Sequence, residues 1–124
     1  MKIPKKVLVT DDDPFNRKLE ETLLQSYGYQ VRSVASGRAA LEQVALDPPD
    51  LILLDLMMPG MDGFDVVRHL KADPATSGIP IIMVTALDDS GSRARLTAAG
   101  VFDIITKPLD RWVLQACIHK LLGD

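Results

Sequence analysis

The chain has 124 residues, 47% of them apolar and 25% charged, and its formal net charge is −3. This length suits one globular domain with its own hydrophobic core, and the composition excludes a disordered chain. The acidic balance argues against direct binding of nucleic acid, and the single cysteine excludes an internal disulfide. Because the sequence has no apolar run of membrane-spanning length and no signal-peptide core, we expect a cytoplasmic protein that does not bind membranes.

Five short apolar runs alternate along the chain with five segments that carry helix signals. The apolar runs predict strands over residues 7–10, 29–35, 51–55, 81–85 and 101–106. Caps and helix breakers predict helices from Asp13 to Gly28, around Leu41 and ending before Pro48, from Asp62 to about Asp73, over 90–99, and from about Asp110 to Leu122.

This alternation predicts a parallel sheet with right-handed crossovers and helices on both faces. The commonest small form of such a sheet is flavodoxin-like, doubly wound and five-stranded, with strand order 2-1-3-4-5. We therefore expect a single α/β domain of the (βα)5 type over residues 1–124.

The first and last predicted helices, like the second and third, carry apolar residues at helical spacing, which indicates a face packed on the core. In the first helix these are Phe15, Leu19, Leu23 and Tyr27, and in the last they are Leu114, Cys117, Ile118, Leu121 and Leu122. We expect Cys117 to be an inert core thiol and Trp112 to be a packing residue. Asp13 and Asp62 are expected to act as a helix cap and a turn residue rather than as ligands.

Polar residues stand at the C-terminal ends of four of the predicted strands. Asp11 and Asp12 follow the first strand, Asp55 ends the third, Thr85 ends the fourth and Lys107 follows the fifth. In the order 2-1-3-4-5 the first and third strands are neighbours. The three carboxylates are therefore predicted to converge at the switch point, where doubly wound sheets bind ligands.

Three clustered carboxylates repel one another, by roughly 4 kcal/mol for a pair about 4 Å apart at an effective dielectric of about 20. Protonation of some of them is one solution, and a hard divalent cation with oxygen ligands, Mg²⁺, is another. Together with Lys107 and the Thr85 hydroxyl, such a cluster is suited to holding phosphoryl oxygens. Asp55 stands alone on the central strand, so it is the candidate nucleophile that becomes an aspartyl phosphate.

The sequence contains four short motifs: Val7-Leu8-Val9 before Asp11-Asp12, Asp55 with Met58-Pro59-Gly60-Met61-Asp62-Gly63, Thr85-Ala86, and Lys107-Pro108. In this order and spacing they resemble the receiver domain of bacterial two-component response regulators over nearly the whole chain. The resemblance implies a phosphorelay signalling switch rather than an enzyme, one that catalyses only its own phosphorylation and dephosphorylation. It also implies a phosphodonor, which is a sensor histidine kinase or a histidine phosphotransfer protein.

The resemblance assigns roles to the acidic residues. It implies that Asp55 is the phosphoacceptor and that Mg²⁺ is bound by Asp12, Asp55 and the backbone carbonyl of Met57. Asp11 matches the acid that acts on the metal largely through water. Met57 and Leu87, the second residues after the acceptor and after the strand-four threonine, are apolar and cannot position an attacking water. We therefore expect a long-lived acyl phosphate.

The switch residues follow the family pattern with one departure. Thr85 matches the hydroxyl that moves to the phosphoryl group, and Lys107 matches the lysine that pairs with it, followed by a peptide bond that is often cis. The family usually has Tyr or Phe three residues before this lysine, whereas this sequence has Ile104, with Phe102 two residues earlier. The sequence therefore does not predict how phosphorylation of Asp55 changes the conformation of the output surface.

The resemblance also implies surfaces for partners. In the family, the exposed part of the first helix and the loop at Leu109 dock the kinase, which makes Phe15, Lys18 and Thr22 candidates for partner choice. The face formed by the fourth helix, fifth strand and last helix is the usual output face, where a downstream effector or a homodimer is expected. The chain is either a stand-alone regulator or the receiver of a larger regulator or hybrid kinase.

Two other classes of protein fit parts of the pattern. Asp11-Asp12-Asp13 offers the Asp-x-Asp of a phosphohydrolase with an Asp nucleophile, but Pro14-Phe15 follows where such enzymes need a hydroxyl residue, and there is no room for a cap domain. A nucleotide or flavin binder needs a Gly-rich or hydroxyl-rich loop after the first strand to hold phosphate. The acidic loop present here repels phosphate, so the strand-end residues favour the receiver.

Overall fold

The structure is a computed structural model that describes residues 3–86 and 90–123. Within these residues lie the strands β1 (Lys6–Thr10), β2 (Gln30–Val34), β3 (Leu51–Asp55), β4 (Ile81–Thr85) and β5 (Asp103–Thr106). The helices are α1 (Pro14–Ser26), α2 (Gly37–Leu46), α3 (Gly63–Ala72), α4 (Ser90–Ala99) and α5 (Arg111–Leu122). None of these helices is both long and apolar enough to cross a bilayer. All neighbouring strands pair in parallel in the order β2-β1-β3-β4-β5, which confirms the predicted doubly wound sheet.

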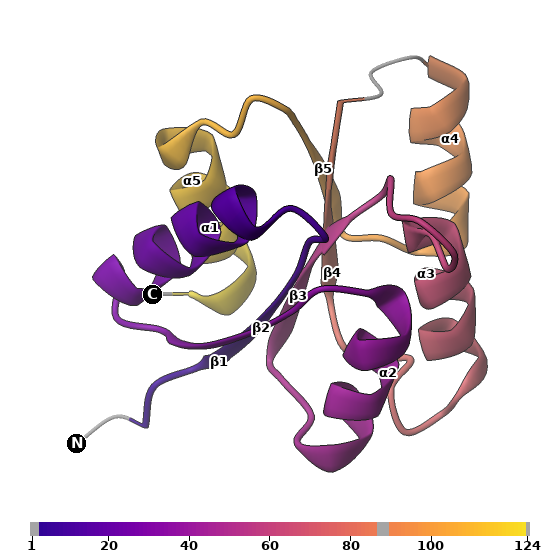
Figure 1. The fold of residues 1–124 in the computed structure, drawn as a ribbon, viewed down its shortest axis with the longest axis horizontal. Coiled ribbons are helices and arrows are strands. Elements are labelled where there is room, and N and C mark those ends of the chain that lie inside the picture. Colours follow the sequence, from indigo (N-terminus) through magenta and orange to yellow (C-terminus); the bar gives the residue numbers. More distant parts are fainter. Residues whose placement is uncertain (1–2, 87–89, 124) are drawn as a thin grey trace.

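Helices cover both faces of the sheet (Figure 1). α1 and α5 lie on one face, and α2, α3 and α4 lie on the other. β3 and β4 are buried at every position, because a strand between two helical layers has no solvent face, and this explains their continuous apolar sequence. Side chains alternate between the two cores: Val7 and Val9 of β1 pack beneath α1 and α5, whereas Leu8 packs on the other side.

Aspartate side chains cap three of the helices and satisfy backbone amides that have no partner inside the helix. The Phe15 amide donates to Asp13 Oδ1 at 2.9 Å, ahead of α1. Asp62 and Asp65 form a capping box at the start of α3, in which each side chain accepts from the backbone amide of the other. Asp110 caps α5. Asp13 is thus the helix cap that the sequence predicts, and Asp62, predicted as a turn residue before a helix, is the N-cap of α3.

The two edge strands are shorter than the sequence predicts. The apolar runs predict strands over 29–35 and 101–106, whereas β2 spans Gln30–Val34 and β5 spans Asp103–Thr106. Each of these strands pairs with a single neighbour, β2 with β1 and β5 with β4. β2 covers the same five pairs as β1, and β5 begins opposite the second residue of β4, so apolar residues outside these pairs, such as the buried Val101, pack without joining the ladder.

The apolar stripe predicted for α1 is partly wrong. Phe15 is 74% exposed and Leu19 is 43% exposed, while the two later members of the stripe pack on the core. Residues four apart advance by about 40° around a helix, so a stripe made only of such steps turns away from the core. The buried positions of α1 are Glu20 and Leu24.

The stripe predicted for α5 is confirmed, but the role predicted for Trp112 is wrong. Leu114, Cys117 and Ile118 are buried, and burial raises the pKa of the Cys117 thiol to about 12, as expected for an inert core cysteine. The Trp112 ring is 67% exposed and lies 5.0 Å from the guanidinium carbon of Arg111. Trp112 precedes Leu114 by two positions, about 200° around the helix, so it faces solvent.

Candidate functional site

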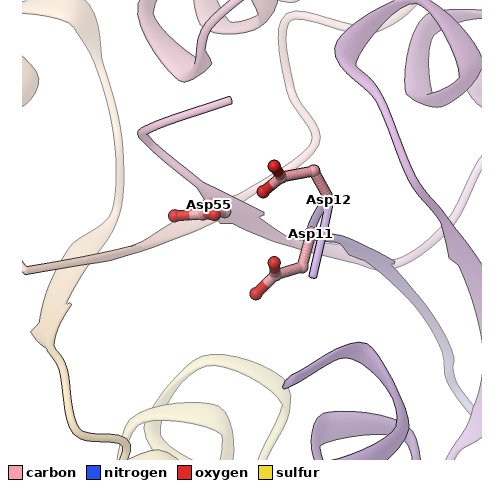
Figure 2. Close-up of side chains that lie close together, drawn as sticks. All are labelled: Asp11, Asp12 and Asp55. Atoms are coloured by element: carbon pink, nitrogen blue, oxygen red, sulfur yellow. The ribbon is translucent and has the colours of Figure 1, made fainter. Parts of the chain in front are cut away.

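Three acids meet where β1 and β3 end, side by side in the sheet. Asp55 is the last residue of β3, and Asp11 and Asp12 follow β1 directly. One carboxylate oxygen from each of the three lies within 4.8 Å of the others, and Figure 2 shows the three carboxylates pointing to the same side. Asp11 and Asp55 are buried, whereas Asp12 is exposed. The structure thus brings together the three acids that the strand ends predict to converge.

Hydrogen bonds hold the carbonyl and one carboxylate oxygen of Asp11. Its Oδ1 accepts a hydrogen bond from the Asp13 amide at 2.9 Å, and its carbonyl accepts one from Arg17 Nη1 at 2.9 Å. Its Oδ2 is buried and has no hydrogen-bond partner within the described part of the chain, and Lys107 Nζ lies 3.8 Å away. A buried carboxylate oxygen of this kind is costly unless a cation approaches it.

Lys107 places a positive charge against the acids. Its Nζ lies 3.3 Å from Asp55 Oδ1, and the Lys107–Pro108 peptide bond is cis, as the motif predicts. Burial raises the pKa of the Asp55 carboxyl; the charge of Lys107 opposes this and that of Asp11 adds to it, which leaves the pKa above its ordinary value. Burial by itself lowers the pKa of Lys107, but Asp55 and Asp11 outweigh it, so the pKa is raised and the ammonium is charged at neutral pH.

Thr85 ends the strand beside β3, and Met57 follows Asp55 by two residues. Thr85 ends β4 and is fully buried, and its carbonyl accepts the backbone amide of Lys107 at 2.8 Å, which joins the ends of β4 and β5. Met57 is 60% exposed, and its backbone amide acts to lower the pKa of Asp55. Leu87, which the sequence pairs with Met57 in the prediction of a long-lived acyl phosphate, lies outside the described residues.

The donor set fits a hard divalent cation. Three carboxylates converge, one of them carries a buried oxygen that accepts no hydrogen bond in the described structure, and Lys107 contributes one positive charge against three acids. Mg²⁺ prefers oxygen ligands and keeps several of its waters. The exposure of Asp12 leaves one side of the cluster open to such waters.

Comparison with known proteins identifies the family. The sequence profile described as the response regulator receiver domain matches residues 7–119. The chain belongs to this family. Receiver domains of two-component systems are signalling switches rather than classical enzymes, and they interact with histidine kinases and effectors. The match decides against the phosphohydrolase and nucleotide-binding alternatives.

Relatives of this receiver occur both alone and within longer proteins. Response regulator PleD from Caulobacter vibrioides is 46% identical over 116 residues, which cover 94% of this chain and 26% of PleD. This chain therefore spans about a quarter of the length of that relative. Protein PilH from Pseudomonas aeruginosa is 32% identical over 118 residues, which cover 95% of this chain and 98% of PilH.

A solved structure matches the receiver over nearly its full length. It is the receiver domain of the sensor histidine kinase PA1611 from Pseudomonas aeruginosa PAO1, with a magnesium ion coordinated in the active site cleft. It is 32% identical to this chain, the TM-score is 0.89, and the match covers 98% of this chain and 100% of that one.

The receiver departs from the usual pattern at the position of the switch aromatic. Ile104 lies in β5 opposite Met83 and packs against the core beneath α3 and α4. Phe102 precedes β5; its amide donates to the Ile81 carbonyl at 2.8 Å, and its side chain is 45% exposed. The position that usually holds an aromatic ring is therefore filled by an aliphatic core residue.

Glu20 is a residue near the site that the sequence prediction missed. It lies on α1 and is only 4% exposed, and its carboxyl interacts electrostatically with Asp11, Lys107 and Asp55. The sequence prediction missed Glu20 because the apolar stripe that it gave for α1 placed the buried face of the helix elsewhere. Glu20 precedes the fully buried Leu24 by one helical turn, so a stripe centred on Leu24 predicts its burial.

Proposed function

We propose that this receiver accepts a phosphoryl group on Asp55 in a Mg²⁺-dependent reaction and thereby changes its output surface. The observation that carries the proposal is a buried Asp55 carboxylate, 3.3 Å from Lys107 Nζ and clustered with Asp11 and Asp12. A carboxylate in such surroundings is a nucleophile next to charges suited to phosphoryl oxygens. The proposed donor is a phosphohistidine of a sensor histidine kinase or a phosphotransfer protein.

The proposed step is a displacement at phosphorus. An oxygen of Asp55 forms a bond to phosphorus while the phosphorus–nitrogen bond of the donor histidine breaks. Lys107 pairs with the carboxylate before the step and with the phosphoryl oxygens after it. Thr85, at the end of the neighbouring strand, contributes its hydroxyl to the phosphoryl group. The receiver catalyses only its own phosphorylation and dephosphorylation.

We assign the metal to Asp12, Asp55 and the backbone carbonyl of Met57, with Asp11 acting through water. When bound, Mg²⁺ supplies positive charge that offsets the carboxylates and the incoming phosphoryl group. The magnesium ion in the cleft of the PA1611 receiver supports Mg²⁺ as the metal. Asp13 has no part in it, because its side chain caps α1.

The output surface is proposed to comprise α4, β5 and α5. The backbone bond from Lys107 to the Thr85 carbonyl links this surface to the phosphoacceptor site. We propose that a downstream effector or a second copy of the receiver binds there. The boundaries 1–124 of the domain and its cytoplasmic location stay predictions.

Mass spectrometry of the intact protein tests the proposal. Incubated with Mg²⁺ and a small-molecule phosphodonor, the wild-type chain is expected to gain one phosphoryl group, and Asp55→Asn is expected to gain none. Asp50→Asn is the matched control, because Asp50 is an exposed aspartate just before β3, at the opposite end of that strand. Equal labelling of the Asp55→Asn variant contradicts the assignment.

A further inference from the structure

Glu20 and Lys107 line one cavity beside the phosphoacceptor site. The cavity has a volume of about 300 Å³. Its lining is mostly apolar, and Asn16, Glu20 and Lys107 are its polar or charged members. The apolar lining residues are Phe15, Leu19, Val84, Pro108 and Leu109. Glu20 is 4% exposed, and no hydrogen bond to its carboxyl is found among the described residues. A buried carboxyl with no such partner, in the same cavity as an ammonium, is unexplained by packing alone.

Glu20 lies on the same side of the sheet as the phosphoacceptor site, as the alternation of side chains along the strands shows. Val9 and Leu53 pack in the core beneath α1 and α5, so residues two further along β1 and β3, Asp11 and Asp55, fall on that same face. Lys107 follows Ile105 of the same core in the same way. α1, which carries Glu20, is one of the two helices that cover this face.

Three charged groups act on the Glu20 carboxyl, from the ends of β1, β5 and β3. The pKa of Glu20 is raised to about 8: burial raises it most, the charges of Asp11 and Asp55 also raise it, and the charge of Lys107 lowers it. From α5, which packs on the same face, the buried side chains are Leu114, Cys117 and Ile118, and the Cys117 thiol is paired with Asp103. Among these three charged groups, Lys107 is the cation.

We propose that Glu20 is a positioning residue for Lys107. The Glu20 carboxylate attracts the Lys107 ammonium toward the cavity, and it competes for that ammonium with a phosphoryl group on Asp55. This inference rests on the proposed function. Lys107 has to leave the unmodified carboxylate and pair with the phosphoryl oxygens, and a charged Glu20 opposes that movement while also repelling the phosphoryl group itself. The phosphorylated state is therefore less populated when Glu20 is ionised than when it is neutral.

Glu20→Gln tests the proposal, because it keeps the shape of the side chain but stays neutral at every pH. The fraction of protein labelled by a small-molecule phosphodonor with Mg²⁺ is measured from pH 6 to 9.5. We expect the ratio of variant to wild type to be near one at the acid end and to rise to about threefold or more at the alkaline end. A cation at the aspartates lowers the pKa of Glu20 and moves this rise to lower pH without removing it.

Controls separate this role from a structural one. Glu42→Gln changes an exposed glutamate on α2, on the far face of the sheet, and is expected to give a ratio near one at every pH. A purely structural effect of Glu20→Gln shifts the ratio by the same factor at all pH values. A flat ratio, or one that falls with pH, overturns the proposal. If Glu20→Gln does not fold, Glu20→Leu, which removes the buried polar group, serves in its place.

A second measurement is independent of phosphorylation. Carbon-13 NMR of the Glu20 carboxyl in the metal-free protein is expected to show a higher pKa in Lys107→Met than in the wild type, because the variant removes the charge that lowers it. An unchanged pKa overturns the inference. If the wild type takes no label at all, the proposed function fails, and this titration still decides whether Glu20 and Lys107 interact.

Discussion

Lys107 is the residue on which the charge balance of the metal-free site depends. Its ammonium lies 3.3 Å from Asp55 and 3.8 Å from Asp11, while Asp12 stays exposed at the edge of the cluster. One ammonium against three carboxylates leaves the site with a negative charge, and that charge favours a divalent cation. The buried Asp11 Oδ2, which has no hydrogen-bond partner in the described structure, points to the same need.

The division of roles between Asp12 and Asp13 can be measured directly. Asp12 belongs to the carboxylate cluster, whereas Asp13 accepts the Phe15 amide and caps α1. Asp12→Ala is therefore expected to weaken Mg²⁺ binding in a calorimetric titration by about tenfold or more, since loss of a charged ligand is worth roughly 1.5–3 kcal/mol. Asp13→Ala is expected to lower stability by about 1 kcal/mol with little effect on the metal. Equal losses of Mg²⁺ affinity in the two variants refute the division.

At the scale of single residues, the sequence predicts site residues that stand at the ends of buried strands. It misses a site residue whose position depends on which side of a helix faces the sheet. Asp11, Asp55 and Lys107 are found because an apolar run stops at or just before each of them. Glu20 is missed because the burial of a helical residue depends on which side of the helix faces the sheet. A surface glutamate and a buried one look the same in an isolated sequence.

Gly63 shows how the loop after β3 and the start of α3 fix the acceptor. A Cβ at this position lies 2.8 Å from the Leu56 Cα and 3.0 Å from the Asp55 carbonyl oxygen, and the Gly63 amide donates to the Leu56 carbonyl at 2.8 Å. Backbone atoms cannot move aside as the end of a side chain can. The helix can therefore pack against the residue that carries the acceptor only if this position is glycine.

Gly63→Ala is accordingly expected to lower the free energy of unfolding by roughly 1–3 kcal/mol and to slow the labelling of Asp55, because it displaces the backbone behind that residue. Gly78→Ala is the matched control, since nothing lies within 4 Å of a Cβ there. Urea denaturation measures stability, and intact-mass spectrometry follows labelling. A Gly63→Ala protein as stable and as rapidly labelled as Gly78→Ala contradicts this account.

Elements between two helical layers are predicted better than those at edges. β3 and β4 match their predicted spans because every residue in them is buried and all but the last residue of each are apolar. β2 and β5 are shorter than predicted, since apolar residues such as Val101 are buried without pairing. The start of α5 is predicted by its Asp110 cap, but the exposure of Trp112 depends on the direction in which that helix faces the sheet.

The two helical layers cover different faces of the sheet, and the site residues fall on the face that α1 and α5 cover. α1 and α5 cover the face on which Asp55 and Lys107 fall, and the exposed Phe15 lies at the mouth of the adjoining cavity. α2, α3 and α4 cover the other face, where Ile104 packs. A partner that delivers a phosphoryl group is therefore expected to approach from the side of α1.

Phe15→Ala separates docking from chemistry at this surface. Phosphotransfer from a histidine kinase that labels the wild type is expected to slow by about tenfold, because an exposed aromatic ring at the centre of an interface carries much of the binding energy. Labelling by a small-molecule donor is expected to change by less than about twofold. Leu46→Ala, which removes an 81% exposed side chain from α2, is the control. An equal loss with both donors contradicts the docking role.

The most direct test of the whole account is to locate the phosphoryl group chemically. Borohydride reduces an aspartyl phosphate to homoserine, which peptide mass spectrometry then places in the sequence. After incubation with Mg²⁺ and a phosphodonor, homoserine is expected at position 55 in the wild type and at no position in Asp55→Asn. Homoserine at Asp11 or Asp12, or a phosphoryl group held instead by His69 or His119, contradicts the claim that Asp55 is the acceptor.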